Sequence, residues 1–211
     1  MQQIMSKSRL AIVLSGLERF NEPKVRQEQY PMDSEIGASL LWNAYLLEDI
    51  GEKSIVDLGC GTGILGIGAL LLNAKRLMFV DSDKKALDIA KNNVSKLKSE
   101  GYRMRIAEFI CMDVEEVDTK ADIALENPPF GTKVKHKDVV FLEKALKIAP
   151  IVYSFHKSET KVFLKRFADK NNAEITHIWD YKFPLKCTFE FHRRQIHRIN
   201  ASCFRFEKTE L

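Results

Sequence analysis

The stretch Asp57-Leu58-Gly59-Cys60-Gly61-Thr62-Gly63 decides how this chain folds. It ends a short apolar run, Ser54–Leu58, and precedes a helix-like apolar run over Ile64–Asn73. Glycines at alternate positions let a backbone turn tightly and approach a ligand closely. A strand, a glycine loop and a helix in this order indicate the first unit of a nucleotide-binding α/β domain.

The segments after this loop alternate between strand-like and helix-like patterns. Including Ser54–Leu58, the pattern predicts strands over Arg76–Val80, Arg105–Met112, Ala121–Leu125, Ile151–Phe155, Glu174–Tyr181 and Arg198–Phe206. The helices predicted between them cover Lys84–Lys98, Lys137–Ile148 and Glu159–Asp169. Such alternation predicts an α/β fold: a Rossmann-like, doubly wound, mostly parallel seven-stranded sheet with helices on both faces. The last two strands have no helix between them, which predicts a C-terminal antiparallel hairpin.

The chain before the glycine loop is predicted to be helical. Helical spacing of apolar residues covers Ser6–Arg19 and continues after Asp33 as far as Leu47, with an extended connection over Glu22–Pro31. A chain of 211 residues is long enough for one domain with a substantial core. We expect residues 1–50 to form an N-terminal helical segment that packs on the core and closes the ligand site, and residues 51–211 to form that core.

Composition excludes several classes of protein. The hydrophobic share of 45% and the charged share of 29% are those of an ordinary globular protein rather than a disordered one. The apolar runs are shorter than the roughly 20 residues that span a bilayer, and Leu10–Leu14 is too short for a signal peptide. The four cysteines form no C-x-x-C pair, and the five histidines add no ligand-like cluster. We therefore expect a soluble, unexported, cytoplasmic protein without a metal site.

Polar residues follow four successive predicted strands, where the ligands of such sheets bind. These residues are Asp57, Asp81, Asp113 and Asn127. Gly61–Gly66 matches G-x-G-x-x-G, and Asp81 lies 20 residues after Gly61, so an NAD-linked enzyme is one interpretation. However, a carboxylate at Asp57 would repel a pyrophosphate, whereas it attracts the ammonium and sulfonium of a methionine moiety. With Asp81 accepting from ribose hydroxyls and Asp113 from an adenine amino group, the sequence favours S-adenosylmethionine.

The motif Asn127-Pro128-Pro129-Phe130 indicates the chemistry. Consecutive prolines stiffen a loop and leave its carbonyls free to accept hydrogen bonds. The Asn127 side-chain oxygen and the Pro128 carbonyl can both accept from one exocyclic NH2 group, while Phe130 stacks on the base that carries it. Methyl transfer to such a planar nitrogen depends on positioning and electrostatics rather than on a strong base. The alternative is a surface turn, which would not explain why the motif follows the fourth strand at the ligand edge. We expect all four residues to form the catalytic set.

With these motifs in place, the chain resembles class I methyltransferases of the NPPF type, and more closely the small-subunit ribosomal RNA adenine N6-methyltransferases of eukaryotes and their archaeal relatives. The resemblance extends over nearly the whole chain and includes Glu28–Pro31, Asp57–Gly63, Asn127–Lys133 and Ser154–Ser158. It implies a substrate amine held by Asn127, Pro128 and Phe130, and a small zinc-binding activator protein as a candidate partner. The family has Thr where Met32 stands and Cys where Thr62 stands, so one hydroxyl contact to the cofactor is lost at position 32.

The motifs and the resemblance together predict the residues that contact S-adenosylmethionine. They are Gln29, Tyr30, Asp57, Gly59, Cys60, Gly61, Thr62, Gly63, Ile64, Asp81, Ser82, Asp113, Val114 and Asn127.

Basic residues are concentrated near the end of the chain. Between Lys182 and Arg198 there are five of them against Glu190 alone, although the whole chain has a formal net charge of only +4. Local basic patches suit a polyanion, with a solvated charged face as the alternative. Aromatic residues at 183, 189 and 191 alternate with these bases, and we expect them to point inward and the bases outward. The candidate RNA contacts are Lys133, Lys135, His156, Lys157, Lys182, Lys186, Arg193 and Arg194, with a structural role as the alternative for His156.

Adenine N6 in ribosomal RNA is the favoured acceptor, and the base must be unpaired or flipped to reach Phe130. Guanine N2 of ribosomal RNA, adenine in DNA and glutamine in a protein are alternatives with the same fold and motif. A non-catalytic RNA-binding or ribosome assembly protein is an alternative of another class.

Overall fold

Seven strands form one sheet in the computed structural model, in the order β3-β2-β1-β4-β5-β7-β6. The structure describes residues 5–20, 32–129, 137–185 and 197–209. The strands are β1 (Ser54–Leu58), β2 (Arg76–Asp81), β3 (Ile106–Cys111), β4 (Ile123–Glu126), β5 (Ile151–Lys157), β6 (Ala173–Leu185) and β7 (His197–Lys208). Strands β1 to β5 are parallel, and β7 is antiparallel to both β5 and β6. The predicted doubly wound sheet and its C-terminal antiparallel hairpin are confirmed.

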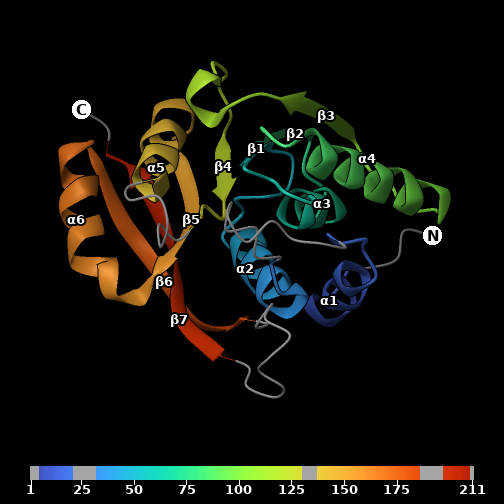
Figure 1. Ribbon diagram of the computed structural model, residues 1–211, viewed down its shortest axis with the longest axis horizontal. Helices are drawn as coiled ribbons and strands as arrows, with labels where there is room; N and C mark the ends of the chain where they lie inside the picture. The colour runs from blue at the N-terminus through green and yellow to red at the C-terminus, as the bar shows by residue number, and fades with distance from the viewer. Residues whose placement is uncertain (1–4, 21–31, 130–136, 186–196, 210–211) are drawn as a thin grey trace, which may run out of the picture.

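Helices cover both faces of this sheet (Figure 1). They are α1 (Lys7–Ser15), α2 (Ser34–Leu46), α3 (Ile64–Leu71), α4 (Lys84–Ser99), α5 (Lys137–Ile148) and α6 (Lys161–Lys170), with short 3-10 helices η2 (Val114–Glu116) and η3 (Ser158–Thr160). Helices α3 and α4 lie beside β1, β2 and β3, while α5 and α6 lie beside the strands of the other half.

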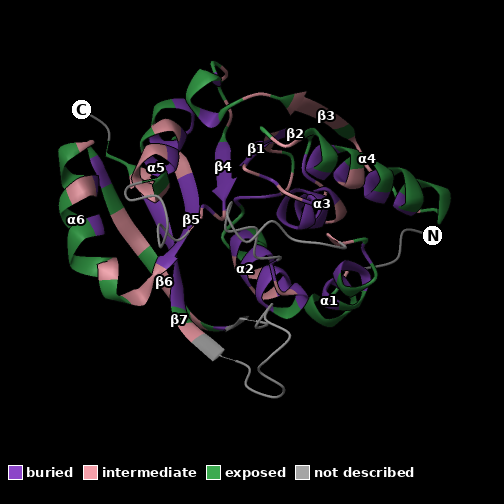
Figure 2. Cartoon of the chain, viewed as in Figure 1, coloured by how far each residue is buried: buried purple, intermediate pink, exposed green. Residues whose placement is uncertain are grey.

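Two hydrophobic cores result, because successive side chains of a strand point to opposite faces. On β4, Ile123 and Leu125 belong to the core under α1 to α4, and Ala124 belongs to the core under α5 and α6. Figure 2 shows the buried residues along the strands and on the inner sides of the helices, with exposed residues on the outer sides. Both faces of β4 are therefore buried up to the point where the chain leaves the sheet.

The ends of several elements differ from the prediction. The first helix ends at Ser15, and the amide of Gly16 donates back to the Val13 carbonyl, so the chain after it was wrongly expected to be helical. Strands β6 and β7 continue beyond the predicted ends and pair as far as Leu185 and His197. Pro184 is tolerated in this pairing because β6 is an edge strand, where one side needs no hydrogen-bond donor.

The N-terminal helices pack on the core through α3, since α1 and α2 contact each other and both contact α3. The Asn93 side chain of α4 accepts from the Glu18 amide at 2.8 Å and donates to the carbonyls of Glu18 and Thr62. The chain just after α1 is thus linked through Asn93 to the glycine loop. A boundary at residue 50 stays a prediction.

A buried ion pair connects the start of the sheet to its last strands. Arg205 of β7 donates through Nε to Asp49 Oδ2 at 2.8 Å, and the Tyr153 hydroxyl of β5 donates to the same oxygen at 2.6 Å. Asp49 is 4% exposed and Arg205 is 7% exposed. Burial and the neighbouring Asp49 raise the pKa of Tyr153, so its hydroxyl keeps its proton.

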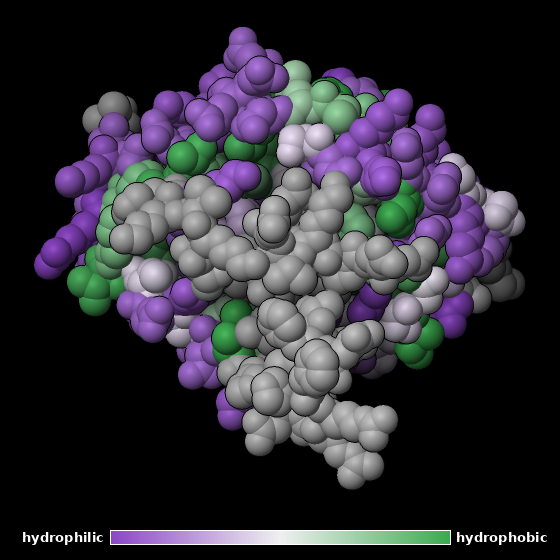
Figure 3. Space-filling view, viewed as in Figure 1, coloured by the Kyte–Doolittle hydropathy of each residue, from purple (hydrophilic) through white to green (hydrophobic). Residues whose placement is uncertain are grey.

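The outer surface is mixed in character. In Figure 3, hydrophilic side chains surround much of the outline of one face, and hydrophobic ones occur in separate groups between them. Within the described ranges, none of the helices is long and apolar enough to cross a membrane.

Candidate functional site

The glycine loop after β1 has a left-handed backbone at three alternate positions. The φ angles of Gly59, Gly61 and Gly63 are +65°, +55° and +86°, a region that side chains disfavour. At Gly59, an added Cβ would lie 2.7 Å from a ring carbon of Phe141. This loop therefore needs glycine both for its turn and for the close approach of α5.

Asp57 lies beneath the loop and fixes the helix that follows it. Its carboxylate is 1% exposed, and Oδ2 accepts from the amide of Gly66 at 2.8 Å. Burial raises the pKa of Asp57 to about 7, with a further contribution from the charge of Asp81. Asp57 also lines the pocket above it, so the same side chain both holds the amide of Gly66 and contributes negative charge to the pocket.

Asp81, at the end of β2, fixes the outer part of the same loop. Its Oδ2 accepts from the amide of Gly61 and its Oδ1 from the amide of Asp83, both at 2.8 Å. Burial raises the pKa of Asp81, while Lys137 acts in the opposite direction. A carboxylate oxygen can accept more than one hydrogen bond, so Asp81 can still accept from ligand hydroxyls.

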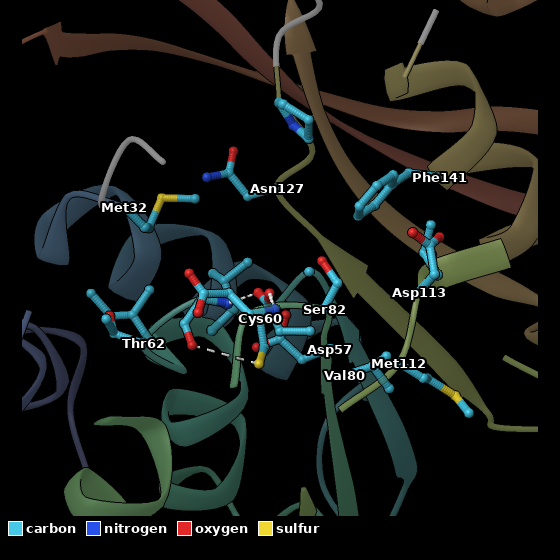
Figure 4. A pocket seen from close by; sticks show the side chains of 18 of the residues that line it. Met32, Asp57, Cys60, Thr62, Val80, Ser82, Met112, Asp113, Asn127 and Phe141 are labelled. Carbon is cyan, nitrogen blue, oxygen red and sulfur yellow. Dashed lines mark hydrogen bonds between the residues drawn. The ribbon is translucent and has the colours of Figure 1, made fainter. Parts of the chain in front are cut away.

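A pocket opens above these carboxylates at the carboxyl ends of β1, β2, β3 and β4. In Figure 4, Asn127 lies at its upper rim, with Met32 and Phe141 on opposite sides. The predicted site residues that line the pocket are Asp57, Gly59, Cys60, Gly61, Thr62, Ile64, Asp81, Ser82, Asp113, Val114, Asn127 and Pro129. The structure therefore brings together residues that lie up to 72 positions apart, from Asp57 to Pro129.

Among the described residues, two of those predicted for the cofactor and the catalytic set do not line this pocket. Gly63 is the N-cap of α3, and Pro128 is buried. Other residues that line the pocket were not predicted from their local sequence, namely Phe20, Leu65, Val80, Asp83, Met112, Lys137 and Phe141. Met32 also lines the pocket. The glycine at position 59 was the available signal for a close neighbour, but it does not reveal that this neighbour comes from α5.

Asn127 has an acceptor without a partner. Its side-chain Oδ1 is buried, and no hydrogen bond reaches it from the part of the chain that is described. A buried polar atom without a partner is costly and rare in proteins, so this oxygen is available to a donor group of a ligand. Phe130 lies outside the described residues, as do Gln29 and Tyr30.

The predicted RNA contacts have mixed outcomes. Lys182 is exposed, and Lys157 is half-buried beside a shallow hollow with Ser158 and Asn200. His156 needs a correction: it is 1% exposed, and its ring nitrogens face Ser154 and Asp138, so packing excludes the direct RNA contact we expected in this conformation. The other candidates lie outside the described residues, namely Lys133, Lys135, Lys186, Arg193 and Arg194.

Phe183 points into the core at 4% exposure, as expected for the aromatic residues of the hairpin. Phe189 and Phe191 lie outside the described ranges. Among the described residues, no group of three His, Cys, Asp or Glu side chains is arranged to hold a metal ion.

Comparison with known proteins gives matches over nearly the whole length of the chain. The methyltransferase small domain family matches residues 33–150. The rRNA N(6)-adenosine-methyltransferase METTL5 of Danio rerio is 32% identical, covering 97% of this chain and 100% of that protein. An uncharacterized protein of Methanocaldococcus jannaschii is 35% identical, covering 97% of this chain and 95% of that protein.

A solved structure has the same fold. The crystal structure of a putative RNA methyltransferase from Pyrococcus horikoshii has a TM-score of 0.88 and 39% sequence identity, covering 99% of this chain and 100% of that one. The glycine loop, the carboxylates at the strand ends and these full-length matches agree. The chain belongs to the family of S-adenosylmethionine-dependent methyltransferases with a methyltransferase small domain, in the branch that includes the rRNA N6-adenosine methyltransferases.

Proposed function

We propose that this protein transfers the methyl group of S-adenosylmethionine to N6 of an adenine in ribosomal RNA. The observation that carries the proposal is the Oδ1 of Asn127, which has no hydrogen-bond partner among the described residues and lies at the rim of the pocket with the carboxylates of β1 and β2. The names of the relatives from Danio rerio, Drosophila melanogaster and Caenorhabditis elegans support the same acceptor, since each is an rRNA N6-adenosine methyltransferase.

The lining of the pocket suits the parts of the cofactor, which supplies a methyl group activated on a positively charged sulfur. Asp81 offers its carboxylate to the ribose hydroxyls. Asp113 and Val114, at the end of β3, offer a polar and an apolar contact to the adenine. The loop from Gly59 to Gly63 and Asp57 beneath it provide backbone groups and negative charge near the methionine moiety.

Asn127 and Pro128 are the proposed acceptors for the substrate amine. The nitrogen lone pair of an adenine amino group is delocalised into the ring, which makes it a poor nucleophile. Two acceptors around the NH2 group favour a pyramidal nitrogen whose lone pair faces the methyl group. The N–C bond then forms as the S–C bond breaks, and the nitrogen releases its extra proton to water. The amide of Asn127 acts by hydrogen bonding, not as a base.

The remaining parts of the proposal concern RNA, a partner and location. Phe130 would stack on the target base, which must be unpaired or flipped to reach it. Lys182, Lys157 and the basic residues around positions 133–135 and 186–194 would contact the RNA backbone. The family resemblance adds a small zinc-binding activator protein as a partner, and the ribosomal substrate adds a cytoplasmic location.

Methyl transfer to ribosomal RNA tests this proposal. The protein is incubated with S-adenosylmethionine labelled in the methyl group and with ribosomal RNA from cells that lack the protein, with and without a candidate activator. Analysis of the digested RNA should give labelled N6-methyladenosine. Methylguanosine as the sole labelled nucleoside would reject the acceptor. Absence of cofactor binding by calorimetry, with and without RNA, would indicate a non-catalytic RNA-binding protein instead.

A further inference from the structure

A group of polar side chains, three of them buried and one partly exposed, lies on the α5 side of the sheet, next to the motif but outside the pocket. It consists of Glu126, Ser154, His156 and Asp138, which we call the polar brace. Glu126 pairs with Ser154 across β4 and β5, and His156 follows two positions later on the same face of β5. The three strand residues are 0%, 0% and 1% exposed. No residue of the polar brace lines the pocket.

His156 connects the middle of the sheet to the first turn of α5. Its Nε2 lies 2.7 Å from Ser154 Oγ, and its Nδ1 lies 3.5 Å from Asp138 Oδ2. When the hydroxyl of Ser154 donates to Nε2, the ring hydrogen is on Nδ1, which faces Asp138 at ion-pair distance and makes no hydrogen bond to a described residue. The imidazole lowers the pKa of Asp138, which favours a charged carboxylate at this contact.

The polar brace lies beside both ends of the segment that contains the motif. Glu126 directly precedes Asn127, which lines the pocket from the end of β4. Asp138 directly follows Lys137, which lines the same pocket from the start of α5. A shift of α5 relative to β5 would therefore change the distance between Asn127 and Lys137, the two pocket residues at the end of β4 and the start of α5.

Packing alone does not explain these side chains. Neither carboxyl oxygen of Glu126 has a hydrogen-bond partner among the described residues, although both are buried, and apolar groups of similar volume would avoid that cost. Their position beside the motif suggests a role in placing it. We propose that His156 is a positioning residue for the proposed methyl transfer: held by Ser154, it fixes the first turn of α5 and thereby the position of Lys137 relative to Asn127 at the pocket.

Two substitutions of His156 separate its two contacts. Asn places an amide group where Nδ1 stands and so retains a contact with Asp138. Gln places an amide group where Nε2 stands and so retains only the contact with Ser154. His156→Gln should lower kcat by about 10- to 100-fold, the scale of misplacing a reacting group, with little change in cofactor affinity. His156→Asn should retain most of the turnover.

Asp138→Ala provides a second route to the same answer, because its side chain is partly exposed and its loss disturbs packing less. It should lower kcat as His156→Gln does, and the double variant should be no worse than either single variant. His177→Gln is the matched control, since His177 is exposed on β6 and should tolerate the change. Thermal unfolding checks that each variant is folded.

The inference depends on the proposed function only for the turnover measurement, so a second measurement is independent of activity. Hydrogen exchange of the backbone amides over residues 137–142, at the start of α5, should be faster in His156→Gln and Asp138→Ala than in wild type, and unchanged in His156→Asn. Equal turnover and equal exchange in His156→Gln and His156→Asn would overturn the positioning role. If the wild type formed no N6-methyladenosine, the proposed function would fail, while the exchange comparison would still decide the role of His156.

Discussion

Asp81 is the last residue of β2 and Asn127 directly follows β4, on the other side of β1, and their hydrogen bonds differ. Both oxygens of Asp81 accept from backbone amides, so this side chain shapes the loop as well as facing the ligand. The Oδ1 of Asn127 accepts from no described group. We therefore assign Asp81 mainly to cofactor binding and Asn127 mainly to the acceptor amine.

Asn127→Ala tests one half of this assignment. Removal of a polar group aimed at the reacting nitrogen should lower turnover by at least about 100-fold and leave cofactor affinity nearly intact. Single-turnover methyl transfer to RNA measures the first quantity, and calorimetry with S-adenosylmethionine measures the second.

Asp81→Ala tests the other half. This variant should weaken cofactor binding, because it removes the ribose acceptor and also releases the amides of Gly61 and Asp83. Asp88→Ala, an exposed aspartate on α4, is the control for a change of charge. If Asn127→Ala and Asp81→Ala both lost cofactor affinity alone, the division of roles would be wrong.

A pocket residue could be predicted from the sequence only where a short motif or a strand end next to it in the sequence marks it. Asn127 and Asp81 stand out because a short motif and a strand end mark them in the sequence. Phe141 and Lys137 enter the pocket only because α5 packs against the glycine loop, which no local pattern reveals. His156 was misplaced for the same reason, since the packing of α5 determines that it is buried.

At the scale of elements, the glycine loop packs directly against α5, because Phe141 occupies the space beside Gly59. Their contact joins the first strand unit to a helix about 80 residues later in the chain, and it forms one wall of the pocket.

Gly59→Ala should therefore destabilise the fold by about 1–3 kcal/mol and weaken cofactor binding, because a Cβ would strain the backbone and collide with Phe141. Gly101→Ala is the control, since its φ of +88° carries the backbone strain without any atom within 4 Å of the added Cβ. Urea unfolding of both variants separates the two effects. Equal losses would show that the contact with Phe141 adds nothing.

At the scale of elements, the sequence predicted strands and helices best where hydrophobic periodicity was uninterrupted. Strand β1 and helix α5 begin and end as predicted. Strand β6 was predicted to end at Tyr181, but it continues through Lys182 and Pro184. Proline is unfavourable inside a sheet but is tolerated in an edge strand such as β6. The pairing with β7 decides its length, and pairing is not a local property.

At the scale of the whole molecule, the buried ion pair of Asp49 and Arg205 connects the turn before β1 to strand β7. Arg205→Met would leave Asp49 buried without its charged partner, and it should lower the free energy of unfolding by about 3–5 kcal/mol. Arg76→Met, which breaks the exposed pair with Glu108, should cost no more than about 1 kcal/mol. Urea denaturation measures both, and similar losses would contradict the structural role of the buried pair.

The stability of the whole fold should also depend on pH through Glu126. Burial raises its pKa from 4.5 to about 8, with a contribution from the charge of Asp138. Between these values the unfolded chain has lost the proton that the folded chain still holds, so the free energy of unfolding falls as pH rises. Asp57 acts in the same direction up to about pH 7.

Glu126→Gln should remove the contribution of this carboxyl and raise the free energy of unfolding at about pH 9 by on the order of 1–3 kcal/mol relative to wild type. The difference between the two proteins should shrink toward about pH 4. Urea unfolding at a series of pH values measures it, and parallel pH profiles would show that Glu126 does not carry a raised pKa.

The two carboxylates beneath and beside the glycine loop have a thermodynamic consequence. Asp57 and Asp81 already hold the amides of Gly66, Gly61 and Asp83, so this part of the backbone is ordered before a ligand arrives. Such preorganisation reduces the conformational entropy that binding would otherwise remove. The cofactor then binds to a preformed site on this side of the pocket, and the entropy lost on binding comes mainly from the cofactor itself.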